Sequence, residues 1–273
     1  MCSSDLMASI LNNIGSLQNN RQLGNTNRNL NNVLNRLSTG SRINNAFEDA
    51  AGLQISNNLR ADVRILGTAR QNANTGVAIA NIADGSLNQA SDLLSRAAEI
   101  ATQAASGTTS DSGREALNSE FQEILGQLDS LGANTNFDGE SVFGGNFAVR
   151  VGEESTQSVD VNVDNLSSGD VGLGGADLLS AGGADAALSA ITGAVESVSA
   201  SRGKIGAIQS RLQSSIDAIS VQQENIQAAE SQIRDADVAT EVVNLTKLQI
   251  LSRSGASAAA QSNLAAKNVL SLL

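Results

Sequence analysis

Two long stretches of the chain carry an apolar residue at every seventh position. A sustained seven-residue repeat holds one seam of a helix against a partner helix, which predicts two long helices in coiled-coil packing. Each series spans 42 residues, or roughly 60 Å of helix at about 1.5 Å per residue. The first series comprises Leu59, Leu66, Ala73, Ala80, Leu87, Leu94 and Ala101, and the second Ile191, Val198, Ile205, Leu212, Ile219, Ile226 and Ile233.

The second long helix is polar where a further apolar row would run, at Arg202, Gln209, Gln223 and Glu230. Shorter helices are expected around it. One, over 113–131, has apolar residues at spacings of four and three, cap oxygens at Ser110–Ser112 and a stop at Gly132. Another passes through Leu23, Leu30, Leu34 and Leu37 and ends at Thr39-Gly40. We therefore predict a helical bundle in which the long helices have more than one neighbour.

Between the long helical stretches the period changes to two. Large apolar residues occupy every second position over 147–151, with Ala148 and Arg150 between them, and again over 159–163, which predicts a β-hairpin. Residues 163–187 are rich in Gly, Ser, Ala and Asp, so we expect turns and a flexible tip there. The predicted fold class is mainly α: a long coiled-coil helical rod formed by paired N- and C-terminal regions, with a small β-hairpin region at its outer part.

Composition excludes several kinds of chemistry. The 273 residues include no His and one Cys, so a Ser-His-Asp triad, a His-ligated zinc and an internal disulfide are all excluded. Aromatic residues make up 2% of the chain, which favours burial of small aliphatic side chains in close helix contacts. Ser201 and Lys204 fit an S-x-x-K nucleophile motif, but they lie inside a heptad helix without companion motifs. We expect no enzyme and no cofactor.

The charges are unevenly spread. The net charge is −11, yet residues 1–70 hold seven Arg and four acids, while residues 111–200 hold fifteen acids and two Arg. An acidic middle argues against nucleic acid as a partner. No apolar run approaches the roughly 20 residues of a membrane span, so we expect no membrane insertion.

Several motifs, in order along the chain, resemble those of the bacterial flagellins. They are Asn35–Asn44 (NRLSTGSRIN) continuing through Asp49–Ile55 (DAAGLQI), Asn134–Gly139 (NTNFDG), Gly203–Gln209 (GKIGAIQ), Arg234–Glu241 (RDADVATE) and Asn268–Leu273 (NVLSLL). The resemblance begins at about Met7, which we expect to be the natural start. Ala266 stands where many flagellins have Pro, which predicts an uninterrupted terminal helix.

The resemblance implies a secreted structural subunit that polymerises into the extracellular flagellar filament for motility. A hook–filament junction protein is the alternative. Residues 1–55 and 232–273 would form an inner terminal coiled-coil domain, and 56–231 an outer helical rod domain with β-hairpins. No variable outer domains are expected. The implied partners are further copies of the chain, the export chaperone and export apparatus, the hook-junction and cap proteins, and, as a hypothesis, Toll-like receptor 5.

The resemblance also implies two sets of site residues. Filament assembly is assigned to Leu37, Arg42, Ile43, Asp49, Ala50, Ala51, Gly52, Asp235, Asp237, Glu241, Val269, Leu270, Leu272 and Leu273. Contact with the innate-immune receptor is assigned to Arg96, Glu99, Ile100, Gln103 and Glu120. Asp235, Asp237 and Glu241 do not have the spacing of an EF-hand calcium loop, so we expect no metal there.

Overall fold

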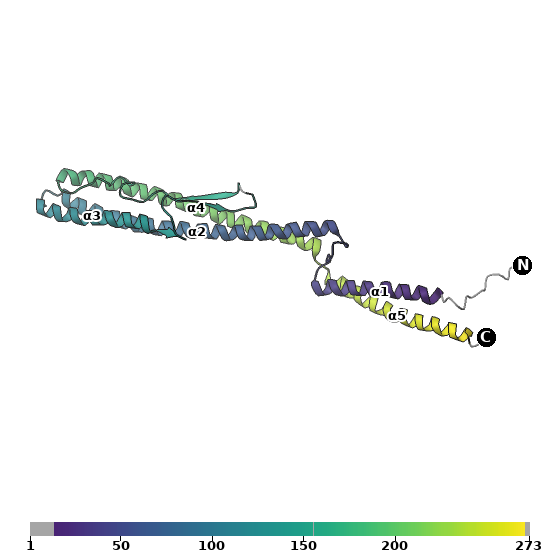
Figure 1. Ribbon diagram of the computed structural model, residues 1–273. Coiled ribbons are helices and arrows are strands. Elements are labelled where there is room, and N and C mark those ends of the chain that lie inside the picture. Colours follow the sequence, from purple (N-terminus) through teal and green to yellow (C-terminus); the bar gives the residue numbers. More distant parts are fainter. Residues whose placement is uncertain (1–13, 155, 271–273) are drawn as a thin grey trace. The chain divides into compact units, whose positions relative to one another are not determined.

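A computed structural model describes residues 14–154 and 156–270, with the side chains of 265–270 excepted. Helices dominate it, as predicted (Figure 1). They are α1 (Ile14–Thr39), α2 (Ala50–Ala105), α3 (Asp111–Asn134), α4 (Ala181–Arg234) and α5 (Val238–Leu270). The strands are β1 (Asn136–Phe137), β2 (Glu140–Ser141), β3 (Asn146–Arg150) and β4 (Ser158–Asn162).

The chain divides into two compact units. The terminal unit contains the described residues up to Ala61 and those from Ile226 onward, and the middle unit contains Asp62–Asn225. Helices α2 and α4 contribute residues to both. Among the described residues no helix combines the length and the apolar character needed to cross a bilayer.

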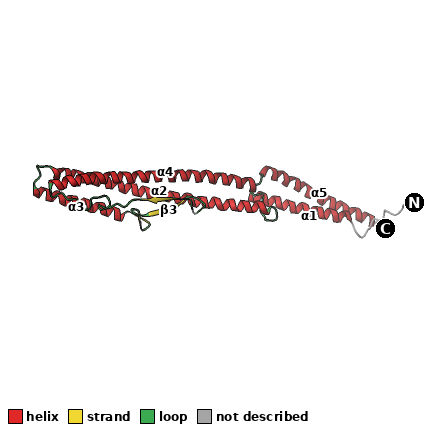
Figure 2. Cartoon of the chain, turned by 90° about the horizontal axis from the view of Figure 1, so that it is seen from above, coloured by secondary structure: helices red, strands yellow, loops and turns green. Residues whose placement is uncertain are grey.

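The apolar heptad rows of α2 and α4 form the core of the middle unit. Leu66, Leu94, Ile191 and Leu212 are each 1% exposed or less, and α3 adds Phe121 at 0%. Figures 1 and 2 both show α3 beside α2 and α4 in this unit. The predicted long helices and their buried seams are therefore confirmed.

The polar row of α4 bonds to α2. In the middle unit Arg202 Nε donates to Asp84 Oδ1 at 2.9 Å, Gln209 Nε2 to Asn81 Oδ1 at 2.9 Å, and Gln223 Nε2 to the Val63 carbonyl at 3.4 Å. In the terminal unit Glu230 pairs with Arg60 at 2.9 Å. These polar side chains thus replace the missing second apolar row with hydrogen bonds and ion pairs.

The predicted hairpin is present as β3 and β4, which pair antiparallel with Val149 opposite Val159. Both side chains are buried against the helices, and Gly76 on α2 makes this approach possible because a Cβ there would lie 2.9 Å from Val149. A second, two-residue hairpin, β1–β2, was not predicted. Its turn places Asp138 and Gly139 at positive φ values of 52° and 85°.

The Gly-rich segment corrects the sequence prediction of a flexible tip. Three leucines in it, Leu166, Leu173 and Leu178, are 4%, 0% and 0% exposed and belong to the core of the middle unit. In addition, α4 begins at Ala181, so residues 181–187 are helical. Burial of each leucine side chain stabilises the folded state by about 1.5–3 kcal/mol. This stabilisation exceeds the tendency of the neighbouring glycines to keep the segment flexible.

The expected helix stop at Gly132 was also wrong. Helix α3 starts as predicted, with the Ser110 hydroxyl accepting from the Gly113 N–H at 3.2 Å, but it continues through Asn134. Gly132 is instead a site of close approach, since a Cβ there would lie 1.7 Å from the Leu166 carbonyl oxygen.

Helices α1 and α5 pair in the terminal unit with a thin apolar interface. Only Thr26 and Val33 of α1 are buried, and hydrogen bonds between the two helices join Ser16 to Asn263, Ser252 to Asn27 and Arg36 to Glu241. Helix α5 runs uninterrupted past Ala266, as expected from the absence of Pro.

Candidate functional site

Two helix breaks lie side by side in the terminal unit. Helix α1 ends at Thr39, followed by Gly40 at φ +68°, and α4 ends at Arg234. The Arg42 N–H donates to the Arg234 carbonyl at 2.6 Å, and the Ala236 N–H donates to the Gly40 carbonyl at 2.9 Å. We call this region, residues 36–52 and 230–241, the joint.

The first motif builds one side of the joint. The Arg42 guanidinium donates to the Ile233 carbonyl at 2.6 Å, and Ile43 is 3% exposed. Asp49 caps the start of α2 by accepting from the Gly52 N–H at 2.9 Å. Gly52 is required there because a Cβ would lie 2.4 Å from the Asp49 carboxylate. Ala50 and Ala51 are exposed in the first turn of α2, and Leu37 is half-buried.

The second motif builds the other side. Asp235 forms a bridge with Ser41, and its carboxylate accepts from the Ser231 hydroxyl at 2.6 Å. Asp237 caps α5, accepting from the Thr240 hydroxyl at 2.6 Å and from the Ala239 N–H at 3.0 Å. These donors, the Thr240 hydroxyl first, lower the pKa of the Asp237 carboxyl. Both carboxylates therefore hold the backbone of the joint in place.

A cluster of charges lies inside the joint. Arg36 contacts Glu241 at 3.3 Å and Glu48 at 4.0 Å, and Glu241 is 8% exposed. Within the described residues, Glu241 Oε2, Arg36 Nε and the Nε and Nη1 atoms of Arg234 are buried without a hydrogen-bond partner. Sequence reasoning did not select Arg36, Glu48 and Arg234 as site residues, since no local pattern connects Arg36 with Glu241 or Arg234, about two hundred positions away.

The paired helices carry several exposed apolar side chains. On α5, Val243 is 67% exposed and Ile250 60%, while the side that meets α1 carries Glu241, Ser252 and Gly255. On α1, Ile14 and Leu17 are 67% and 57% exposed. The remaining exposed members of this surface are Leu34, Val238, Val242, Leu251 and Leu264. We call the whole set the terminal apolar face.

The last predicted assembly residues fall partly outside what the structure describes. Val269 and Leu270 lie in α5, but their side chains are not described, and Leu272 and Leu273 lie outside the described residues. The expected start at Met7 also lies outside them.

The proposed receptor residues lie on α2 and α3 of the middle unit. Arg96 pairs with Glu99 at 2.9 Å and with Glu120 at 2.8 Å. Both carboxylates, Glu120 first, raise the pKa of Arg96. Gln103 is exposed, whereas Ile100 is 2% exposed and belongs to the core. The structure thus brings Arg96, Glu99 and Glu120 together at the surface.

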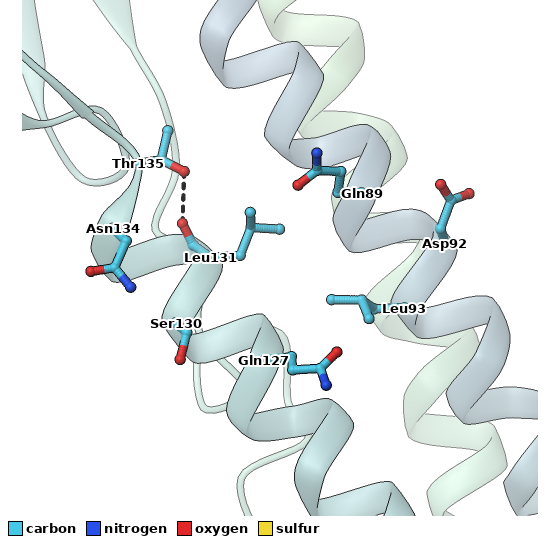
Figure 3. Close-up of a pocket in the computed structure, with 8 residues that line it drawn as sticks. All are labelled: Gln89, Asp92, Leu93, Gln127, Ser130, Leu131, Asn134 and Thr135. Carbon is cyan, nitrogen blue, oxygen red and sulfur yellow. Dashed lines mark hydrogen bonds between the residues drawn. The ribbon is translucent and has the colours of Figure 1, made fainter.

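A cleft of about 630 Å³ lies between the same two helices (Figure 3). Gln89, Asp92 and Leu93 come from α2, and Gln127, Ser130 and Leu131 from α3, with Asn134 and Thr135 at its end. The Thr135 hydroxyl donates to the Leu131 carbonyl at 2.7 Å. Among the described residues that line this cleft, Asp92 is the one ionisable group.

Comparison with known proteins covers almost the whole chain. Residues 10–148 match the profile of the bacterial flagellin N-terminal helical region, and residues 188–273 match that of the C-terminal helical region. The flagellar filament 30.7 kDa core protein of Treponema maltophilum is 33% identical over 96% of this chain and 98% of its own length. The flagellin of Bacillus subtilis is 31% identical with the same coverage.

A solved structure has the same fold. A protein of Vibrio parahaemolyticus described as flagellar hook-associated matches with a TM-score of 0.59 at 15% identity, over 69% of this chain and 100% of that one.

Proposed function

Because the chain belongs to the bacterial flagellins, it is a structural subunit of the flagellar filament, and we propose that the terminal apolar face joins its copies. The exposure of Val243 and Ile250, which lie away from the side of α5 that meets α1, carries this proposal. Contiguous exposed apolar surface of this kind marks an interaction site in soluble proteins. Copies joined head to tail without ring closure form an open helical filament.

The two units then have different places in the filament. The predicted inner domain, residues 1–55 and 232–273, carries the terminal apolar face and would line the core of the filament. The predicted outer domain, 56–231, carries most of the acids and would face solvent. The closed core of the middle unit supports this arrangement, since that unit needs no partner to bury its heptad rows.

Within the assembly set, the residues divide into two roles. Arg42, Ile43, Asp49, Gly52, Asp235, Asp237 and Glu241 would act indirectly, as positioning residues that hold the joint. Ala50 and Ala51 are exposed and would contact neighbouring copies, as would Leu37 and the four residues Val269, Leu270, Leu272 and Leu273. The hydrogen bonds and the ion pair that the first group makes within the joint, and the exposure of Ala50 and Ala51, support this division.

Further partners belong to the same proposal. A filament outside the cell requires secretion, so the chain would meet an export chaperone and the export apparatus before assembly, and hook-junction and cap proteins at the filament ends. Recognition by Toll-like receptor 5 would use Arg96, Glu99, Gln103 and Glu120, which are exposed. The junction-protein alternative is not favoured, because the relatives that match over 96% of the chain are named as filament core proteins and flagellins.

Seeded polymerisation of the purified chain, followed by negative-stain electron microscopy, tests the proposal. We expect long uniform filaments from the wild type and none from the double variant Val243→Asp and Ile250→Asp. Val221→Asp is the matched control, because Val221 is 59% exposed but lies in the middle unit. Filaments formed by the double variant at the wild-type concentration would contradict the role of the terminal apolar face.

A further inference from the structure

A groove of about 570 Å³ runs between β3 and α2 in the middle unit. All five residues of β3 line it, together with Asn72, Thr75, Gly76 and Ile79 of α2 and Phe137 of β1. Phe137 and Phe147 are half-buried, so each presents part of its ring to the groove. The groove therefore combines an apolar lining with access from solvent.

The outer edge of β3 is unpaired at this groove. The sheet has two strands, and the Val151 N–H donates to the Gln157 carbonyl at 3.0 Å, which makes the 149/159 and 147/161 pairs the hydrogen-bonded ones. The backbone groups of Asn146, Ala148 and Arg150 consequently point away from β4. Free strand edges of this kind are templates for contact with another chain.

Arg150 is the charged residue of the groove. It is exposed and has no ion pair or hydrogen bond within the described residues, whereas Arg96, Arg114, Arg202 and Lys204 of the same unit are each paired with a carboxylate. The middle unit holds twenty-one acids and eight basic residues. A second copy of the chain is therefore an abundant source of acidic groups for Arg150.

The same unit presents an acidic, apolar projection at its far end, where α4 begins. Leu179 is 53% exposed, and Asp177, beside it, is exposed as well. The loop that carries them is fixed: Leu178 is fully buried, its N–H donates to Asn118 Oδ1 at 2.9 Å, and Gln122 Nε2 donates to the Ala176 carbonyl at 3.1 Å. Leu179 is thus held outward by a preorganised loop, which lowers the entropic cost of docking.

We propose that the Leu179 loop of one copy docks in the β3–α2 groove of the next copy, with Leu179 against Phe137 and Phe147 and Asp177 near Arg150. The inference rests on the proposed filament function and adds a specific contact between middle units. Groove and loop lie about 40 Å apart along α2, from residues 72–79 to its end at Ala105. A projection at one end and a groove nearer the other make a head-to-tail contact, which builds an open filament when its rotation does not close a ring.

Disulfide trapping in assembled filaments tests the contact directly. In a Cys2→Ser background, the chain with Leu179→Cys and Thr75→Cys is polymerised, oxidised and run on a denaturing gel. We expect a ladder of covalently linked chains. The control pair, Leu179→Cys with Ser95→Cys, places the second thiol on an exposed α2 position about 30 Å from the groove and should stay monomeric on the gel.

Two point variants measure the contribution of the contact. Leu179→Asp should raise the critical concentration for seeded elongation at least about tenfold, and Arg150→Glu should raise it severalfold. The control variants Val221→Asp and Arg211→Glu, at exposed positions outside the contact, should leave the critical concentration unchanged. Wild-type filaments without the ladder, or Leu179→Asp behaving as Val221→Asp, would overturn this inference and leave the proposed function standing. A wild-type chain that never forms filaments would overturn both.

Discussion

The two units of this chain use their apolar residues in opposite ways. In the middle unit the heptad rows face inward, and Ala73, Ala80 and Leu212 are fully buried. In the terminal unit Val243 and Ile250 face outward. The charges differ too: the middle unit has twenty-one acids against eight basic residues, and the terminal residues have seven acids against nine.

This difference separates folding from assembly within one chain. The middle unit completes its core alone, and its acids keep neighbouring copies from associating nonspecifically. The terminal unit leaves apolar surface for other copies to cover, and its small net charge offers little electrostatic opposition to close contact. Substitutions in the buried core of the middle unit should therefore change stability most, and substitutions of exposed residues, those of the terminal apolar face above all, should change association.

The largest expected effect is on the core of the middle unit. Phe121→Ala should lower the free energy of unfolding by about 3–5 kcal/mol, because Phe121 is fully buried and its removal leaves a cavity. Phe47→Ala is the control, since Phe47 is 81% exposed, and it should change stability by less than about 0.5 kcal/mol. Urea unfolding followed by circular dichroism measures both. Equal losses from the two variants would contradict the assignment of the core.

Hydrogen exchange should separate the two units in the monomer. Amides in the middle of α1 and α5 should open at a free energy at least about 3 kcal/mol lower than those in the middle of α2, because their interface buries few apolar side chains. Mass spectrometry of exchanged peptides measures this, and filament formation should remove most of the difference. Uniform protection across the monomer would show that the terminal unit is as self-sufficient as the middle one.

A pair of glycines in α3 gives a sharper contrast. Gly132→Ala should destabilise the middle unit by about 1–3 kcal/mol, because its Cβ would collide with the Leu166 carbonyl. Gly126→Ala meets nothing within 4 Å and should stabilise the helix by about 0.5–1 kcal/mol. Thermal unfolding of both variants tests the packing of the Gly-rich segment. A neutral Gly132→Ala would mean that this segment is not packed as described.

The smallest expected effect depends on pH. Asp164 accepts from Lys204 at 2.8 Å and from Ser201 at 2.9 Å, and these bonds lower the pKa of its carboxyl below the ordinary value of 3.8. The ionised form is favoured in the folded state, so its contribution is present above about pH 4 and is lost as the pH falls through the lowered pKa. Asp164 is half exposed, so the contribution is a few tenths of a kcal/mol.

Asp164→Asn should therefore be slightly less stable than the wild type at pH 7, with the gap closing toward pH 3. Chemical unfolding at the two pH values measures the gap. A gap that widens in acid would contradict the lowered pKa.

The long helices and the β3–β4 hairpin were predictable because their patterns are periodic and local. Leu94 and Leu212 each belong to a seven-residue apolar repeat that is visible in the sequence alone. The packing of Leu166, Leu173 and Leu178 was not predictable in this way, because their partners lie on helices far away in the sequence and the intervening glycines suggest flexibility.

The candidate site was predicted only in part. The motif residues of the joint were found through family resemblance, but their hydrogen bonds join residues such as Arg42 and Arg234 that no local pattern connects. The contacts of α5 with α1 were not predicted either, because Glu241 and Ser252 bond to residues of α1 more than two hundred positions away.

The polar row of α4 has a consequence for how the long helices can move. A seam of apolar residues repeated every seven positions has translational symmetry: α4 shifted along α2 by one repeat would bury nearly the same surface. The Arg202–Asp84 pair breaks that symmetry, because the residues seven positions before and after Asp84 are Val77 and Ser91, which carry no charge. A slip of one repeat would leave Arg202 without a carboxylate partner, whereas Gln209 would meet Asn74 or Asn88 in place of Asn81. The ion pair therefore selects one register of α4 along α2.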